Sequence, residues 1–78
     1  MRIIGEIPHT KYKITLFHWN NKYILKFEIG LCEQTYKFSE MDITSVDQVK
    51  GAVNDEAFMK KVEELFDQMH ANLNTYID

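Results

Sequence analysis

Alternating apolar and polar side chains run through residues 11–30 and predict a β-hairpin. An Asn20-Asn21 turn fits its centre, because Asn tolerates the positive φ of a type I′ turn better than other residues with a Cβ. The inner face of this hairpin pairs Tyr12 with Ile29, Ile14 with Phe27, Leu16 with Leu25, and His18 with Tyr23. Its outer face pairs Lys13 with Glu28, Thr15 with Lys26, Phe17 with Ile24, and Trp19 with Lys22.

One further strand is expected on each side of the hairpin. Residues 2–8 predict the first strand, and Pro8-His9-Thr10 turns the chain back. Three residues of this strand are expected on one side: Ile3, Gly5 and Ile7. A tight type II′ turn at Gly30-Leu31 would begin the fourth strand. Its register pairs Ile29 with Cys32, Phe27 with Gln34, Leu25 with Tyr36, and Tyr23 with Phe38. The same register puts Glu28 beside Glu33, an unfavourable pair that leaves a longer loop as the alternative.

After Phe38 the period changes to that of helices. Ser45-Val46-Asp47-Gln48 matches a capping box, in which Ser45 and Gln48 satisfy each other's free backbone N–H groups. The box predicts a short helix over residues 45–53, and its inward side chains are Val46, Val49 and Val53.

A long amphipathic helix is predicted over residues 55–77, capped by Asn54 or Asp55. Its apolar side chains fall within an arc of about 100°. They are Phe58, Val62, Leu65, Phe66, Met69, Leu73 and Tyr76. A helix of about 22 residues reaches ~33 Å, whereas an eight-residue strand spans ~26 Å. The last turns should therefore overhang the sheet, leaving Leu73, Tyr76 and Ile77 frayed or packed on a neighbour.

These elements predict one α+β domain over residues 1–78, with the order ββββαα in two layers. Residues 1–38 form a four-stranded antiparallel meander, and the two C-terminal helices pack on one face of it. The pattern leaves open whether the short helix lies beside the long one or closes an edge of the sheet.

Composition supports a domain that folds without metal or disulfides, since 45% of its 78 residues are hydrophobic. Cys32 is the single cysteine, which excludes an internal disulfide and is typical of cytosolic proteins. No apolar run has the length of a signal peptide or a membrane span. We therefore expect a small cytoplasmic protein of bacterial type that does not bind membranes.

The net charge of −3 divides unevenly along the chain. Residues 1–38 carry six Lys or Arg against three acids, whereas residues 39–78 carry three lysines against nine acids. The sheet is thus expected to be basic and the helices acidic, which bears on partners, although solubility alone often produces such a split.

No catalytic or cofactor motif is present. None of the three glycines forms a phosphate-binding loop, and neither Ser39 nor Ser45 resembles an activated nucleophile. No two of His9, His18, His70 and Cys32 share a metal-ligand spacing. His18 is instead expected to be a partly buried histidine bonded to a neighbour. The sequence predicts a non-enzyme with no metal and no cofactor.

One surface remains as a candidate contact site, the outer sheet face. Its residues are Lys13, Phe17, Trp19, Lys22, Ile24 and Lys26. Three large apolar groups on a solvated face favour a protein–protein interaction module or a homodimer. In the alternative interpretation lysine stems cover them, with Lys22 over Trp19, and the cluster only stabilises the hairpin.

Two other functions are compatible with this surface. Lysines interleaved with aromatic rings suit single-stranded nucleic acid, and some single-strand binders share the layout of a meander followed by a helix. The absence of arginine from this face argues against that function. A small enzyme or ligand carrier is the third hypothesis, but a two-layer domain has little room for a pocket of ~300 Å³. No small-molecule ligand is therefore expected.

Overall fold

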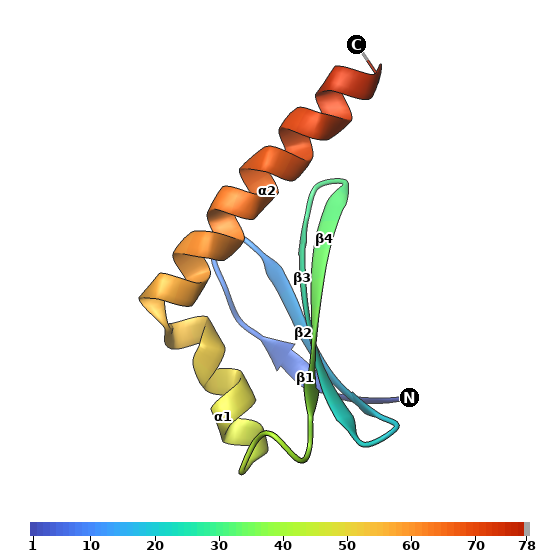
Figure 1. Ribbon diagram of the computed structural model, residues 1–78, viewed down its shortest axis with the longest axis vertical. Coiled ribbons are helices and arrows are strands. Elements are labelled where there is room, and N and C mark those ends of the chain that lie inside the picture. The colour runs from blue at the N-terminus through green and yellow to red at the C-terminus, as the bar shows by residue number, and fades with distance from the viewer. Residues whose placement is uncertain (78) are drawn as a thin grey trace.

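The computed structural model describes residues 1–77, which form a four-stranded antiparallel sheet with helices along one face (Figure 1). The strands are β1 (Arg2–Ile7), β2 (Lys13–Trp19), β3 (Lys22–Ile29) and β4 (Cys32–Ser39). The helices are α1 (Val46–Lys50), a 3₁₀ turn η1 (Gly51–Asn54) and α2 (Glu56–Ile77). The order β1-β2-β3-β4 confirms the ββββαα α+β fold. Asp78, the last residue of the predicted domain, lies outside the described residues.

Both predicted turns and their registers are confirmed. Asn20 and Asn21 have φ values of 54° and 62°, and Gly30 has a φ of 58°. The expected cross-strand pairs are present from Lys13–Glu28 onward, including Glu28 opposite Glu33. The predicted Tyr12–Ile29 pair is not among them, because β2 begins at Lys13. The Lys26 Nζ lies 3.7 Å from Glu28 Oε1 and 3.5 Å from Glu33 Oε2. One ammonium thus offsets the repulsion between the two carboxylates, which makes the tight turn acceptable.

The prediction for β1 is wrong at Ile3. A β-bulge between Ile3 and Gly5 shifts the register, so that Ile3 lies opposite Phe17 while Gly5 lies opposite Leu16. Because one extra residue reverses the alternation, Ile3 joins the outer face, and Gly5 and Ile7 stay on the inner face.

The core lies between the inner sheet face and the helices. Ile14, Leu16, Leu25 and Phe27 are fully buried there. The helices contribute Val49, Val62 and Phe66. Val49 belongs to α1, which contacts β3, a central strand. The short helix therefore covers part of the inner face and does not close an edge of the sheet.

One polar pair is buried within this core. The Gln34 side chain donates from Nε2 to the Val62 carbonyl of α2 at 2.9 Å, and the Tyr36 hydroxyl donates to Gln34 Oε1. Burial raises the pKa of Tyr36 above its ordinary value. Because each polar atom has a partner, Gln34 can occupy a core position and fix α2 against β4.

The two helix starts differ in how well they follow the prediction. Asp55 Oδ1 accepts from the Phe58 N–H at 3.1 Å, so the predicted cap of α2 is confirmed. The capping box of α1 is wrong, because the Ser45 side chain makes no capping bond. Gln48 Oε1 instead accepts from the Thr44 N–H at 2.9 Å and from the Thr44 hydroxyl. Because Thr44 offers two donors to that oxygen, the Gln48 side chain bonds to Thr44 and not to Ser45, the residue that the capping box predicts.

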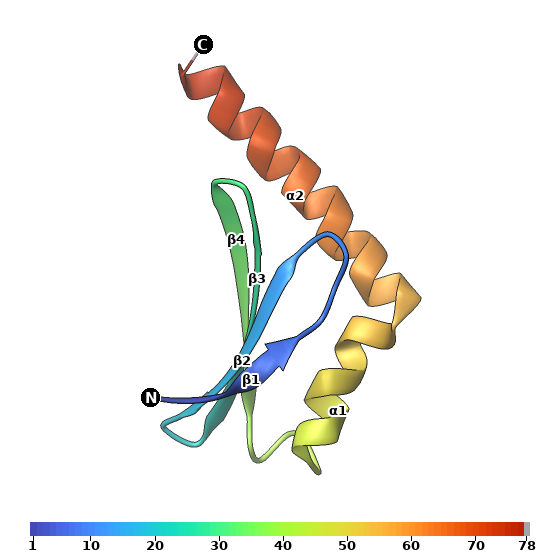
Figure 2. The ribbon, with the colours of Figure 1, turned by 180° about the vertical axis from the view of Figure 1, so that it is seen from behind.

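The C-terminal part of α2 extends beyond the β3–β4 hairpin, as predicted (Figures 1 and 2). Tyr76 and Ile77 are exposed there, and Leu73 is half-buried. The apolar arc predicted Leu65 as a core residue, and this prediction is wrong, since Leu65 is 43% exposed. Val62 and Phe66 are the buried residues of α2, and Leu65 lies at the margin of its apolar stripe.

Candidate interaction surface

The outer sheet face is organised in rows that run across the strands. One row consists of Ile3, Phe17, Ile24 and Lys37, taken from β1 to β4. Trp19 lies two residues from Phe17 on β2 and so shares this face. We call Ile3, Phe17, Trp19 and Ile24 the outer patch. The bulge in β1 adds Ile3 to the apolar residues predicted from the sequence.

The members of the outer patch differ widely in exposure. Ile24 is only 6% exposed and Phe17 is half-buried, whereas Trp19 is 50% and Ile3 66% exposed. Ile24 lies on a central strand between Phe17 and Lys37, so the side chains of both neighbouring strands can cover it. The accessible residues of the outer patch are therefore Trp19, Ile3 and, in part, Phe17, whereas Ile24 is buried beside Phe17.

Carboxylates accompany two of the candidate lysines. The Lys13 Nζ lies 3.9 Å from Glu6 Oε1, and Lys26 lies between two glutamates as described above. Lys22 is exposed at the end of β3, beside Trp19. The lysines of the outer face are Lys13, Lys22, Lys26 and Lys37, and its acids are Glu6, Glu28 and Glu33. The face is therefore close to neutral, because the glutamates compensate most of the positive charge that was expected for the sheet.

The alternative interpretation places Lys22 over Trp19, but the cation–π contact found among residues 1–77 is a different one. That contact joins Lys11 and Tyr12, with Nζ 5.6 Å from the ring centroid. Half of the Trp19 side chain stays open to solvent. The lysine cover proposed in the alternative interpretation is therefore incomplete at Trp19.

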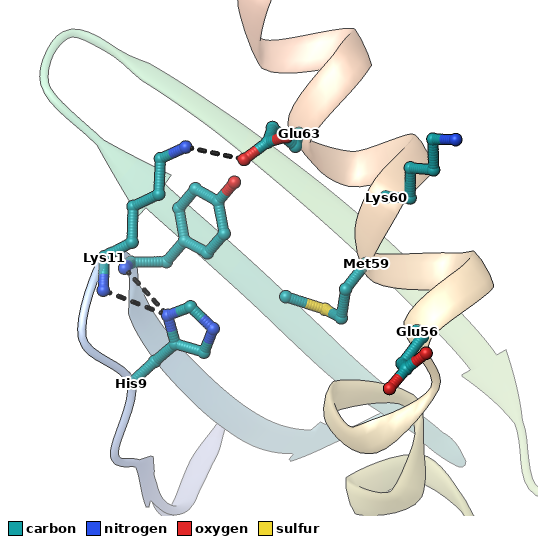
Figure 3. Close-up of a pocket in the computed structure, with 7 residues that line it drawn as sticks. His9, Lys11, Glu56, Met59, Lys60 and Glu63 are labelled. Atoms are coloured by element: carbon teal, nitrogen blue, oxygen red, sulfur yellow. Dashed lines mark hydrogen bonds and ion pairs between the residues drawn. The ribbon is translucent and has the colours of Figure 1, made fainter.

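A cleft of about 300 Å³ lies on the other side of the domain, between the loop after β1 and the first turns of α2 (Figure 3). The expectation that the fold lacks room for a cleft of this size is wrong. The loop holding His9 and Lys11 stands opposite Met59 and Glu63 of α2, so the cleft forms beside the two layers and not between them.

Three of the polar residues that line this cleft, His9, Lys11 and Glu63, have partners. His9 Nδ1 accepts from the Lys11 N–H at 3.0 Å and the Tyr12 N–H at 3.3 Å. The Lys11 ammonium donates to Glu63 Oε2 at 2.9 Å. This hydrogen bond raises the pKa of Lys11 above, and lowers the pKa of Glu63 below, its ordinary value. The Lys11–Glu63 bond thus joins the loop to α2 across the cleft.

The histidines are separated along the fold. His18 bonds to Glu40 and packs at 4.9 Å against the Tyr23 ring, which confirms a partly buried histidine with a bonded neighbour. His9 stacks on Tyr12 at 5.0 Å. Within residues 1–77 no three His, Cys, Asp or Glu side chains gather in a way that could hold a metal ion.

In the same described range, no helix combines the length and apolar character needed to cross a membrane. The helix α2 has 22 residues, but charged side chains occupy its outward side.

One residue of the outer patch, Ile3, could not be assigned from alternation alone. The signal available in the sequence is Gly5, because a glycine inside a strand often marks a bulge.

Comparisons with protein-family models, curated protein sequences and solved structures found no significant match to this chain.

Proposed function

We propose that this protein is a non-enzymatic interaction module that binds a protein partner, or a second copy of itself, through the outer patch. The observation that carries this proposal is the exposure of Trp19 and Ile3, which both neighbour Phe17, on a sheet face that no helix covers. Aromatic anchors on a buried apolar floor, with charged groups around them, are typical of protein interfaces.

Charge favours a protein over single-stranded nucleic acid. Phosphate contacts need uncompensated cations, yet Lys13 and Lys26 both lie within salt-bridge distance of glutamates. The face also offers one exposed tryptophan, where stacking of successive bases needs several rings. Nucleic-acid binding is the outcome that would replace our proposal.

The test places a photo-cross-linking amino acid at position 19 and exposes cells producing the protein to ultraviolet light. Leu65 is a matched control position, since it is apolar and 43% exposed but lies on α2. We expect a discrete protein adduct from position 19 and none from position 65. Adducts of equal yield at both positions, or adducts removed by nuclease, would contradict the proposal.

A titration of the free domain with mixed short single-stranded oligonucleotides separates the two partner classes. Amide-resolved NMR shifts confined to residues 13–19 and 22–26, fading between low and physiological salt, would establish the nucleic-acid function. Unchanged spectra at both salt concentrations are expected if the partner is a protein.

A further inference from the structure

The two free edges of the sheet differ in their ability to pair with another strand. The edge strand β1 has six residues and is interrupted by the bulge between Ile3 and Gly5. The other edge strand, β4, has eight residues in an unbroken register with β3. No helix crosses in front of β4 in Figure 1. Bulges protect edges from pairing, so β4 is the open edge of this sheet.

The tight turn at Gly30 determines which backbone groups of β4 face outward. In a two-residue hairpin the residues next to the turn, Ile29 and Cys32, form a hydrogen-bonded pair, and such pairs then alternate along the strands. The residues between them direct their N–H and C=O groups away from β3. These residues are Glu33, Thr35 and Lys37, and all three are exposed.

We propose that two copies of this chain associate by antiparallel pairing of β4 with β4, about a two-fold axis at Thr35. In that register Glu33 of each copy lies opposite Lys37 of the other, and the two Thr35 side chains meet at the centre. A register centred on Glu33 or on Lys37 would oppose like charges. The Thr35-centred register therefore pairs each of these two charges with its opposite, as a self-complementary two-fold interface requires.

Three outward pairs give about six backbone hydrogen bonds between the copies. The two sheets become one continuous sheet of eight strands, and both outer patches lie on the same side of it. This inference does not depend on the proposed function, because the pairing uses the backbone of β4 and not Trp19 or Ile3.

Concentration-dependent measurements test the association directly. A single strand pair is a small interface, so we expect dimers at about 0.1–1 mM by sedimentation equilibrium. The amide hydrogens of Glu33, Thr35 and Lys37 should exchange more slowly as concentration rises. A monomer up to about 1 mM, or exchange rates independent of concentration, would overturn the proposal.

Thr35→Pro tests the backbone contribution. It removes an N–H that points away from β3, and edge strands tolerate proline at such positions, so the fold should be retained. We expect association to weaken by about tenfold or more, since two central hydrogen bonds are lost and the ring blocks pairing. Trp19→Ala is the matched control and should leave dimerisation unchanged. Loss of dimers in Trp19→Ala with retention in Thr35→Pro would place self-association on the outer patch instead.

Charge exchange tests the register. Glu33→Lys and Lys37→Glu should each abolish self-association, because each variant opposes like charges across the two-fold axis. A mixture of the two variants should form heterodimers, and the double variant should recover homodimers. Unfolding midpoints and NMR spectra establish that each variant is folded. Failure of the mixture to associate, with both proteins folded, would exclude the Thr35-centred register.

Discussion

Both faces of the β2–β3 hairpin carry large apolar side chains, more of them on the inner face, but the two faces bury them in different ways. On the inner face, Phe27 and Leu16 are buried beneath α1 and α2. On the outer face, Ile24 is 6% exposed although no helix lies over it. Helices exclude water from the first face, and neighbouring strands exclude it from the centre of the second.

This difference shows that an uncovered sheet face can have a dry centre and an accessible border. Ile24 lies in the middle strands, whereas Trp19 is at a strand end and Ile3 is on the edge strand. The stabilising and contact-making roles proposed for the outer patch can therefore belong to different residues of it.

The largest expected effect is on the inner face. Phe27→Ala removes a fully buried ring that packs against Tyr12, Tyr36 and Phe58. We expect the free energy of unfolding to fall by about 3–5 kcal/mol, measured by urea denaturation. A domain of this size has little more stability to lose. A loss below about 1 kcal/mol would mean that the inner face is not the core.

Ile24→Ala tests whether the outer face has a dry centre. We expect the free energy of unfolding to fall by about 2–3 kcal/mol. This is less than for Phe27→Ala, because the neighbouring side chains of the uncovered face can move into the space that Ile24 leaves. The same urea experiment measures it. A cost within the range of ordinary surface substitutions, about 0.5 kcal/mol, would show that Ile24 is in contact with water.

Trp19→Ala should change stability by about 1 kcal/mol or less, because half of the side chain is already exposed. Partner binding, detected by the cross-linking experiment with the probe moved to Ile3, should be lost. Leu65→Ala is the control for stability and should have a similarly small effect. A loss of several kcal/mol from Trp19→Ala would show that the patch is buried and structural.

The smallest effect is expected at the Lys11–Glu63 contact, which joins the loop to α2. The pKa of Glu63 is lowered in the folded chain by its hydrogen bond to Lys11, so the contact stabilises the fold above the ordinary glutamate pKa. That contribution is lost as pH falls below the ordinary glutamate pKa, which is about 4, and through the lower pKa of Glu63 in the folded chain. Glu63→Gln should therefore lower the urea midpoint slightly at pH 7 and not at pH 3.

Glu64→Gln is the matched control for that experiment, since it removes a neighbouring exposed carboxylate of α2. Its difference from the unmodified chain should be small and similar at both pH values. A Glu63→Gln difference that grows as pH falls would contradict the assigned direction of the pKa shift.

Local patterns in the sequence determine the strands, both tight turns and the cap of α2. Asn20 and Asn21 predict a type I′ turn, and side-chain alternation then fixes the register of β2 and β3, because each pair follows from the turn. Asp55 predicts the start of α2 for the same reason, since its bond to Phe58 spans three residues. Interactions of this short range depend on neighbouring residues and little else.

Only the tertiary structure decides the direction of Ile3, the exposure of Leu65 and the burial of Ile24. The bulge that turns Ile3 outward depends on how β1 meets β2. Leu65 is exposed because of where α2 crosses the sheet, and Ile24 is buried because Phe17 and Lys37 flank it. Each outcome depends on elements brought together across the chain, and periodicity within one element carries no information about what lies beside it.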